Sequence, residues 1–218
     1  MDVNADILIV TANRIEAKAV LDAFSKATSK PASMFTSGDC TYSDLGSLND
    51  HRVVMVQSEM GSGSLGASQQ TVEEAIATLE PSAVFMVGVA FGMDSDKQNI
   101  GDVLVSKQIL LYEPQRIGTK NGELKLLPRG SRVDASTRLL SLFRAVDARR
   151  GTDDPVAAFG LILSGEKLVD NVAFREQLRT LEPEAIGGEM EGSGLYTSCQ
   201  KKKVDWILVN FYHDHLVA

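Results

Sequence analysis

Short runs of consecutive apolar residues recur along this chain, and amphipathic segments lie between them. Runs of this kind, rich in valine and isoleucine, predict strands that are buried on both faces, as in a largely parallel sheet. The predicted strands cover residues 7–10, 52–57, 83–87, 102–106, 156–163 and 206–209.

The segments between these runs carry apolar residues three and four positions apart, which predicts helices with one buried face. The predicted helices cover residues 14–26, 67–79, 135–148 and 172–180, with a last one that ends in the lysine run 201–203. Residues 113–132 contain two prolines and three glycines and predict a long loop of the kind that often covers a site. Alternating strands and helices predict an α/β fold, a sandwich of three layers.

The most informative stretch is Gly-Gly-Glu-Met-Glu-Gly at residues 187–192. Glu189 and Glu191 flank Met190, just before a predicted helix, where free N–H groups and the helix dipole stabilise an ionised carboxylate. An ionised carboxylate can accept hydrogen bonds from both hydroxyls of a vicinal diol such as a ribose. The alternative is that both glutamates only cap the helix.

Other polar groups also follow predicted strands. Glu16 lies in the first turn of the helix after the first strand, where open α/β sheets bind ligands, although it could merely compensate the helix dipole. A Gly/Ser loop at residues 58–66 and a glycine-punctuated segment at 88–92 end two further strands. The Gly/Ser loop matches no nucleotide-phosphate motif, so an anion site and a plain tight turn are both open.

Composition limits the possible functions. The chain has 218 residues, enough for one domain with a full core, and a formal net charge of -7. This charge argues against binding to nucleic acid or to an anionic membrane surface. Neither a signal peptide nor a span long enough for a bilayer is visible. The two cysteines are far apart and form no disulfide framework, so a cytoplasmic protein is expected.

The pattern as a whole resembles the nucleoside phosphorylase superfamily, and within it the bacterial 5′-methylthioadenosine/S-adenosylhomocysteine nucleosidases. The resemblance runs from about residue 7 to residue 214. Its carriers are residues 9–12 with Glu16, the loop 60–63, and the segments 87–92, 101–103, 164–166 and 189–192. It implies a three-layer fold with a mixed central sheet, a homodimer or larger assembly, and hydrolysis of the N-glycosidic bond of a purine nucleoside without a cofactor.

Carried over by position, the resemblance implies that Glu191 holds the ribose hydroxyls, with Met190 packed on the sugar. Glu16 would position the attacking water. Asp214 would protonate N7 of the leaving purine. Glu189, Ala90 and Leu168 complete the expected substrate-binding set, and Leu168 aligns with an aromatic residue that often stacks on the base.

Several positions depart from the family pattern. A basic residue near the attacking water aligns with Asn210, and a serine that helps there aligns with Val89. The single domain, 1–218, lacks the loop and long C-terminal helix that follow the aspartate in the family. Phosphorolysis on the same fold and a non-catalytic nucleoside or nucleotide sensor therefore stay open as alternatives. His213, Asp214 and His215 are too weak a pattern for a metal site, and no metal is expected.

Overall fold

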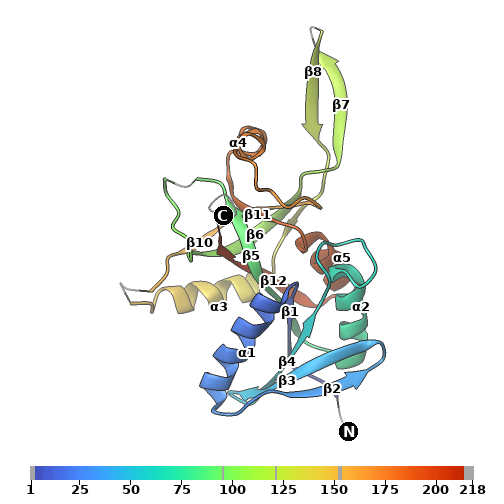
Figure 1. Ribbon diagram of the computed structural model, residues 1–218, viewed down its shortest axis with the longest axis vertical. Helices are drawn as coiled ribbons and strands as arrows, with labels where there is room; N and C mark the ends of the chain where they lie inside the picture. Colours follow the sequence, from blue (N-terminus) through green and yellow to red (C-terminus); the bar gives the residue numbers. More distant parts are fainter. Residues whose placement is uncertain (1–2, 95, 121, 152–153, 214–218) are drawn as a thin grey trace.

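A ten-stranded mixed sheet organises the computed structural model, which describes residues 3–94, 96–120, 122–151 and 154–213 (Figure 1). The main path of the sheet runs β11-β10-β6-β12-β5-β1-β4-β3-β2, and β9 pairs with β6. The strands of this sheet are β1 (Ile7–Thr11), β2 (Ser33–Ser37), β3 (Cys40–Leu48), β4 (His51–Gln57), β5 (Ala83–Gly92), β6 (Val103–Leu111), β9 (Arg132–Asp134), β10 (Ala157–Ser164), β11 (Ala185–Glu189) and β12 (Asp205–Tyr212).

The centre of the sheet is parallel, as the continuous apolar runs predict. Strand β1 pairs in parallel with β4 and β5, and β5 pairs in parallel with β12. Antiparallel pairs lie around this centre: β2 with β3, β3 with β4, β6 with β9, and β12 with β6. The parallel centre brings the carboxyl ends of β1, β4 and β5 to one edge, where α/β folds place their ligand sites.

The sheet curls back on itself where β11 meets β5. Strand β11 pairs in parallel with β10 and also antiparallel with β5, through Gly187 opposite Gly92 and Gly188 opposite Phe91. Glycine is required here, because a Cβ on Gly188 would lie 2.2 Å from the Phe91 ring. This pairing brings residues 187–191 beside the end of β5.

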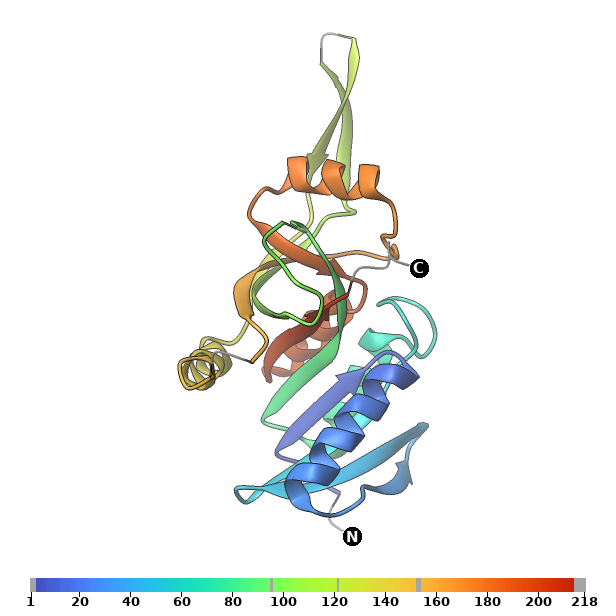
Figure 2. The same ribbon diagram turned by 60° about the vertical axis from the view of Figure 1, so that its left-hand side comes forward.

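Helices cover both faces of the central strands (Figures 1 and 2). Helix α1 (Arg14–Thr28) packs through Ala17 and Val20 on the face that carries Ile9. Helices α2 (Ser68–Leu79) and α5 (Gly192–Lys202) lie side by side on the opposite face, where Leu8 and Val10 are buried. Two further helices are α3 (Thr137–Asp147) and α4 (Val172–Leu181).

The predicted loop at residues 113–132 is wrong. Most of this segment forms a hairpin of β7 (Gln115–Lys120) and β8 (Glu123–Pro128), which projects from the body of the molecule in Figure 1. The glycines of this segment did indicate a turn correctly, because Gly122 has a φ of 85° between the two strands. The residues on either side of the turn pair with each other and not with the main sheet, and they form no long apolar run that would have predicted strands.

Strands β5 and β6 are longer than predicted. Strand β5 continues through Gly88 to Gly92, because these glycines serve close packing inside the sheet and do not end the strand. Both cysteines are free, as expected. Within the described ranges, the helices are all too short or too polar to cross a membrane.

Candidate active site

A small cavity of about 50 Å³ lies at the edge of the sheet where β1, β5 and β11 end. It brings together six residues that the sequence singles out, and they come from four separate segments of the chain: Glu16, Ala90, Leu168, and the consecutive Glu189, Met190 and Glu191. Convergence of polar side chains from separate segments on one cavity is typical of a binding or catalytic site.

Glu191 is half-buried and reaches across to the Gly/Ser loop. Its Oε1 accepts the N–H of Gly61 at 2.9 Å, and its Oε2 accepts the N–H of Met190 at 3.3 Å. Gly61 has a φ of 84°, a left-handed conformation that turns its N–H toward the carboxylate. Burial raises the pKa of Glu191 above its ordinary value, and the charges of Glu16 and Glu166 add to this.

Glu189 caps the start of α5, a role that the sequence left open for both Glu189 and Glu191. Its Oε2 accepts the N–H groups of Glu191 and Gly192, each at 2.7 Å, at the start of α5. The side chain is buried, and burial, followed by the charge of Glu191, raises its pKa to about 8. Glu191, in contrast, makes no such cap with its side chain.

Glu16 is held by backbone N–H groups from two elements. Its Oε2 accepts from Ala12 at 2.8 Å and from Asn13 at 3.2 Å, and its Oε1 accepts from Val89 of β5 at 3.1 Å. With the Asn13 side chain it forms a capping box at the start of α1. Burial raises the pKa of Glu16, and the three N–H groups act in the opposite direction.

The apolar members of the set line the same cavity. Ala90 of β5 is buried, whereas Leu168 is 55% exposed. Met190 lies between the two glutamates, and its carbonyl accepts the Ser62 hydroxyl at 2.8 Å. Asp214 lies outside the described residues. The residue before it is fixed close by, because the N–H of His213 donates to the carbonyl of Ala90 at 2.9 Å.

Sequence reasoning missed how closely the Gly/Ser loop is tied to the site. The N–H of Ser62 donates to the Glu166 carboxylate at 3.1 Å, and the Ser68 hydroxyl donates to the carbonyl of Glu191 at 2.8 Å. The loop glycines were visible in the sequence, but their partners lie more than a hundred residues away. Lys167 was also missed; of the described residues that line the cavity, it alone has a cationic side chain, and it pairs with Glu113.

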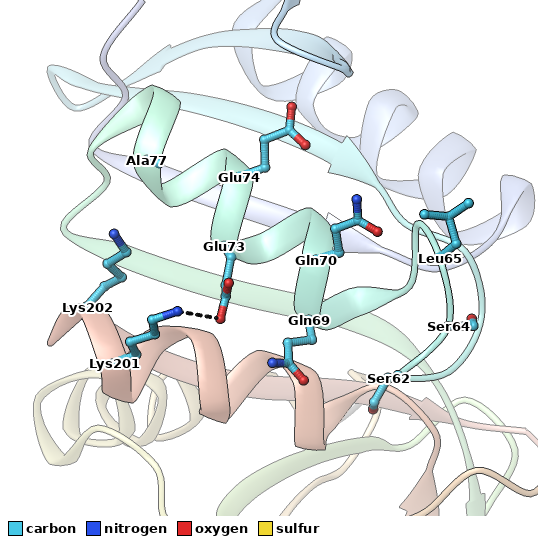
Figure 3. Close-up of a pocket in the computed structure, with 11 residues that line it drawn as sticks. Ser62, Ser64, Leu65, Gln69, Gln70, Glu73, Glu74, Ala77, Lys201 and Lys202 are labelled. Carbon is cyan, nitrogen blue, oxygen red and sulfur yellow. Dashed lines mark hydrogen bonds and ion pairs between the residues drawn. The ribbon is translucent and has the colours of Figure 1, made fainter.

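A larger hollow of about 730 Å³ lies beside the site, between α2 and α5 (Figure 3). Its walls carry Gln69, Gln70, Glu73 and Lys201, with Ser62 at the end nearest the site. Glu73 and Lys201 form an ion pair at 3.3 Å across it. None of the six predicted residues lines this hollow.

The fold and the convergent carboxylates define a class of protein. A family model described as the phosphorylase superfamily matches residues 6–218, and the chain belongs to that superfamily.

Its relatives include nucleosidases of two kinds. The chain is 28% identical to a death domain-containing ATP nucleosidase of Amphimedon queenslandica, over 95% of this chain and 42% of that protein. It is also 28% identical to a 5′-methylthioadenosine/S-adenosylhomocysteine nucleosidase of Staphylococcus epidermidis, over 78% of this chain and 72% of the relative. The chain thus spans less than half the length of the ATP nucleosidase.

Solved structures share the fold. A Helicobacter pylori 5′-methylthioadenosine/S-adenosylhomocysteine nucleosidase superposes with a TM-score of 0.77 at 21% identity, over 99% of this chain and 87% of that one. A futalosine hydrolase of the same organism gives a TM-score of 0.76 at 22% identity, over 96% and 84%.

Proposed function

We propose that this protein hydrolyses the N-glycosidic bond of an adenine nucleoside and releases adenine. The observation that carries the proposal is the convergence of Glu16, Glu191 and Met190 on one cavity that apolar residues such as Ala90 and Phe91 also line. The named relatives support it, because they include methylthioadenosine/adenosylhomocysteine and ATP nucleosidases. Glycoside cleavage passes through a transition state that resembles an oxocarbenium ion, and carboxylates suit both its charge and its proton transfers.

In this proposal Glu191 accepts the ribose hydroxyls. A carboxylate offers about four acceptor positions, and the Gly61 and Met190 N–H groups use two of them. Met190 packs on the sugar, with Ala90 and Leu168 around the base. Glu189 fixes the start of α5 and so holds the backbone of Glu191 in place.

The hydrolytic step requires a base and an acid. Glu16 would take a proton from the attacking water while the water oxygen bonds to C1′ and the bond from C1′ to the base breaks. The departing adenine would take its proton at N7, and Asp214 is proposed as the acid that supplies it. The carboxylate of Glu16 is well placed for a base because three N–H groups fix its orientation.

The experiment that tests the proposal incubates the purified protein with methylthioadenosine, adenosylhomocysteine, adenosine and ATP, each with and without phosphate. Free adenine is separated and quantified. Adenine release that does not depend on phosphate and is lost in Glu191→Ala supports the proposal. Adenine release that survives Glu191→Ala unchanged overturns the assignment of the site, and a rate that requires phosphate replaces hydrolysis with phosphorolysis.

ATP is a second candidate substrate. It is favoured by the alignment with the ATP nucleosidases, which covers 95% of this chain against 78% for the methylthioadenosine nucleosidase. The substrate series above separates the two by their relative kcat/KM. A nucleoside sensor without turnover is the remaining alternative; it predicts tight nucleoside binding with no adenine release from any of the four.

We also propose an oligomeric state and a cellular location for the protein. We propose a homodimer in the cytoplasm, with one domain at 1–218 and helices on both faces of the sheet in the three-layer arrangement. The free cysteines and the excess of acidic residues are consistent with this setting. Light scattering of the purified chain at several concentrations tests the dimer.

A further inference from the structure

An exposed glutamate that does not line the cavity is tied to the loop that holds Glu191. Glu166 follows β10, and both oxygens of its carboxylate lie within hydrogen-bond distance of the Ser62 nitrogen, at 3.1 and 3.2 Å. The two residues are 104 positions apart in the chain. Because Glu166 is exposed, a role in the packing of the core does not explain this contact.

The neighbouring position of the loop is shaped around the same carboxylate. A Cβ on Gly61 would lie 2.6 Å from Glu166 Oε2, so the carboxylate occupies the space that a side chain would need. Gly61 also has a φ of 84°, which residues with a side chain rarely adopt. Glycine at position 61 therefore allows Glu166 to lie directly against the backbone of the loop.

This piece of backbone also carries the contact to Glu191. The N–H of Gly61 donates to Glu191 Oε1 at 2.9 Å, and the next N–H along the chain, that of Ser62, donates to Glu166. Burial raises the pKa of Glu191 most, and the charges of Glu16 and Glu166 add to the rise, so Glu166 and Glu191 repel each other. The two consecutive N–H groups offset this repulsion and hold both carboxylates on one loop.

We propose that Glu166 is a positioning residue for ribose recognition: it fixes the Ser62 N–H, and so directs the Gly61 N–H that holds the Glu191 carboxylate. The inference rests on the proposed role of Glu191 as the acceptor of the ribose hydroxyls. A carboxylate that turns away from its N–H donor can still accept one hydroxyl, but it meets two vicinal hydroxyls only in a defined orientation. Glu166 therefore acts on the choice between sugars; it touches no substrate and exchanges no proton.

The experiment compares adenosine with 3′-deoxyadenosine, which lacks one of the two hydroxyls. The 3′-hydroxyl is chosen because the 2′-hydroxyl lies next to C1′, where positive charge develops, and its removal would alter the cleavage itself. Calorimetry gives the ratio of the two Kd values where neither nucleoside is cleaved, and kcat/KM for adenine release gives the corresponding ratio where they are. The wild-type protein should favour adenosine about 10- to 100-fold.

Two substitutions of Glu166 separate its positioning role from a general loss of structure. Glu166→Ala removes the acceptor of the Ser62 N–H, and the preference for adenosine should fall about tenfold. Glu166→Gln keeps one acceptor oxygen for this N–H and should retain most of the preference. Both variants should fold, because residue 166 is exposed, and thermal unfolding verifies this.

A matched control is Glu59→Ala. Glu59 lies in the same loop and is exposed, and its carboxylate has no hydrogen bond or ion pair within the described part of the chain. The control removes the same charge and should leave the preference unchanged. An unchanged preference in folded Glu166→Ala, or an equal fall in Glu59→Ala, overturns the inference.

The wild-type protein shows which of the two proposals fails. If it does not distinguish the two nucleosides, the role of Glu191 in ribose binding is wrong, and this inference falls with it. If it distinguishes them and Glu166→Ala does so equally well, only the positioning role of Glu166 is wrong.

Discussion

Two hollows lie side by side in this molecule, and the smaller one carries the candidate chemistry. The cavity of about 50 Å³ at the ends of β1, β5 and β11 contains carboxylates that backbone N–H groups hold in place. The hollow of about 730 Å³ between α2 and α5 has exposed polar side chains and a surface ion pair (Figure 3).

The two hollows differ in how their charged groups are held. Charged groups that are already fixed in position need no reordering when a reaction develops charge. Mobile charged groups at the surface must be ordered first, and water screens them. The carboxylates of the small cavity accept hydrogen bonds from backbone N–H groups of separate segments and have raised pKa values, whereas Glu73 of the large hollow pairs with the exposed side chain of Lys201. The following predictions test this contrast.

The largest effect is expected for Glu191→Ala. The change removes the acceptor for the ribose hydroxyls and releases the N–H of Gly61, so kcat/KM for adenine release should fall about 10³-fold. Steady-state assays with methylthioadenosine and ATP measure it. A loss of less than tenfold would contradict the role assigned to Glu191.

Glu16→Gln should come next. The amide keeps the shape and one acceptor oxygen but cannot take a proton, so kcat should fall about 10²- to 10⁴-fold with little change in KM. Single-turnover kinetics separate the chemical step from binding. A rise in KM at constant kcat would mean that Glu16 only binds substrate.

Glu189→Gln should change how stability depends on pH. A carboxyl whose pKa is raised to about 8 in the folded protein binds a proton more tightly than the unfolded chain does, so its contribution is lost as pH rises from about 4.5 to 8. The wild-type protein should therefore lose stability relative to the glutamine variant between pH 5 and pH 8.5, and its Tm should fall by several degrees more over this range.

Thermal unfolding of both proteins across this pH range measures the difference. The same dependence on pH in both would show that Glu189 is ionised in the folded state.

The smallest effect is expected in the large hollow. Glu73→Ala removes the partner of Lys201, whose side chain is 63% exposed, and should change the free energy of unfolding by about 0.5 kcal/mol or less. Adenine release should not change. A substantial loss of activity in this variant would mean that the α2–α5 hollow is part of the active site, and it would contradict the contrast between the two regions.

The fold was predictable where apolar periodicity is strong. The run at residues 7–10 and the amphipathic segment after it became β1 and α1, because a buried parallel strand and a helix with one buried face have distinct patterns. The β7–β8 hairpin was not predicted, because its two strands pair with each other and not with the main sheet, and their residues form no long apolar run. The extension of β5 beyond residue 87 was not predicted, because glycines usually indicate the end of a strand.

The candidate site, too, was predictable only in part from the sequence. Local sequence was sufficient to single out Glu16, Glu189 and Glu191, because a carboxylate in the first turn of a helix after a strand has a recognisable setting. Only the tertiary structure separated the roles of the two neighbouring glutamates: Glu189 caps α5, and Glu191 contacts the Gly/Ser loop.

The sequence by itself determined the buried central strands and the amphipathic helices between them, the acidic character and the residue types at the strand ends, since these follow from composition and local spacing. The tertiary structure decided which of those residues meet. Gly61 and Glu191, 130 positions apart, join only because β11 closes on β5. Contacts across such distances depend on strand pairing and packing, which no local pattern encodes.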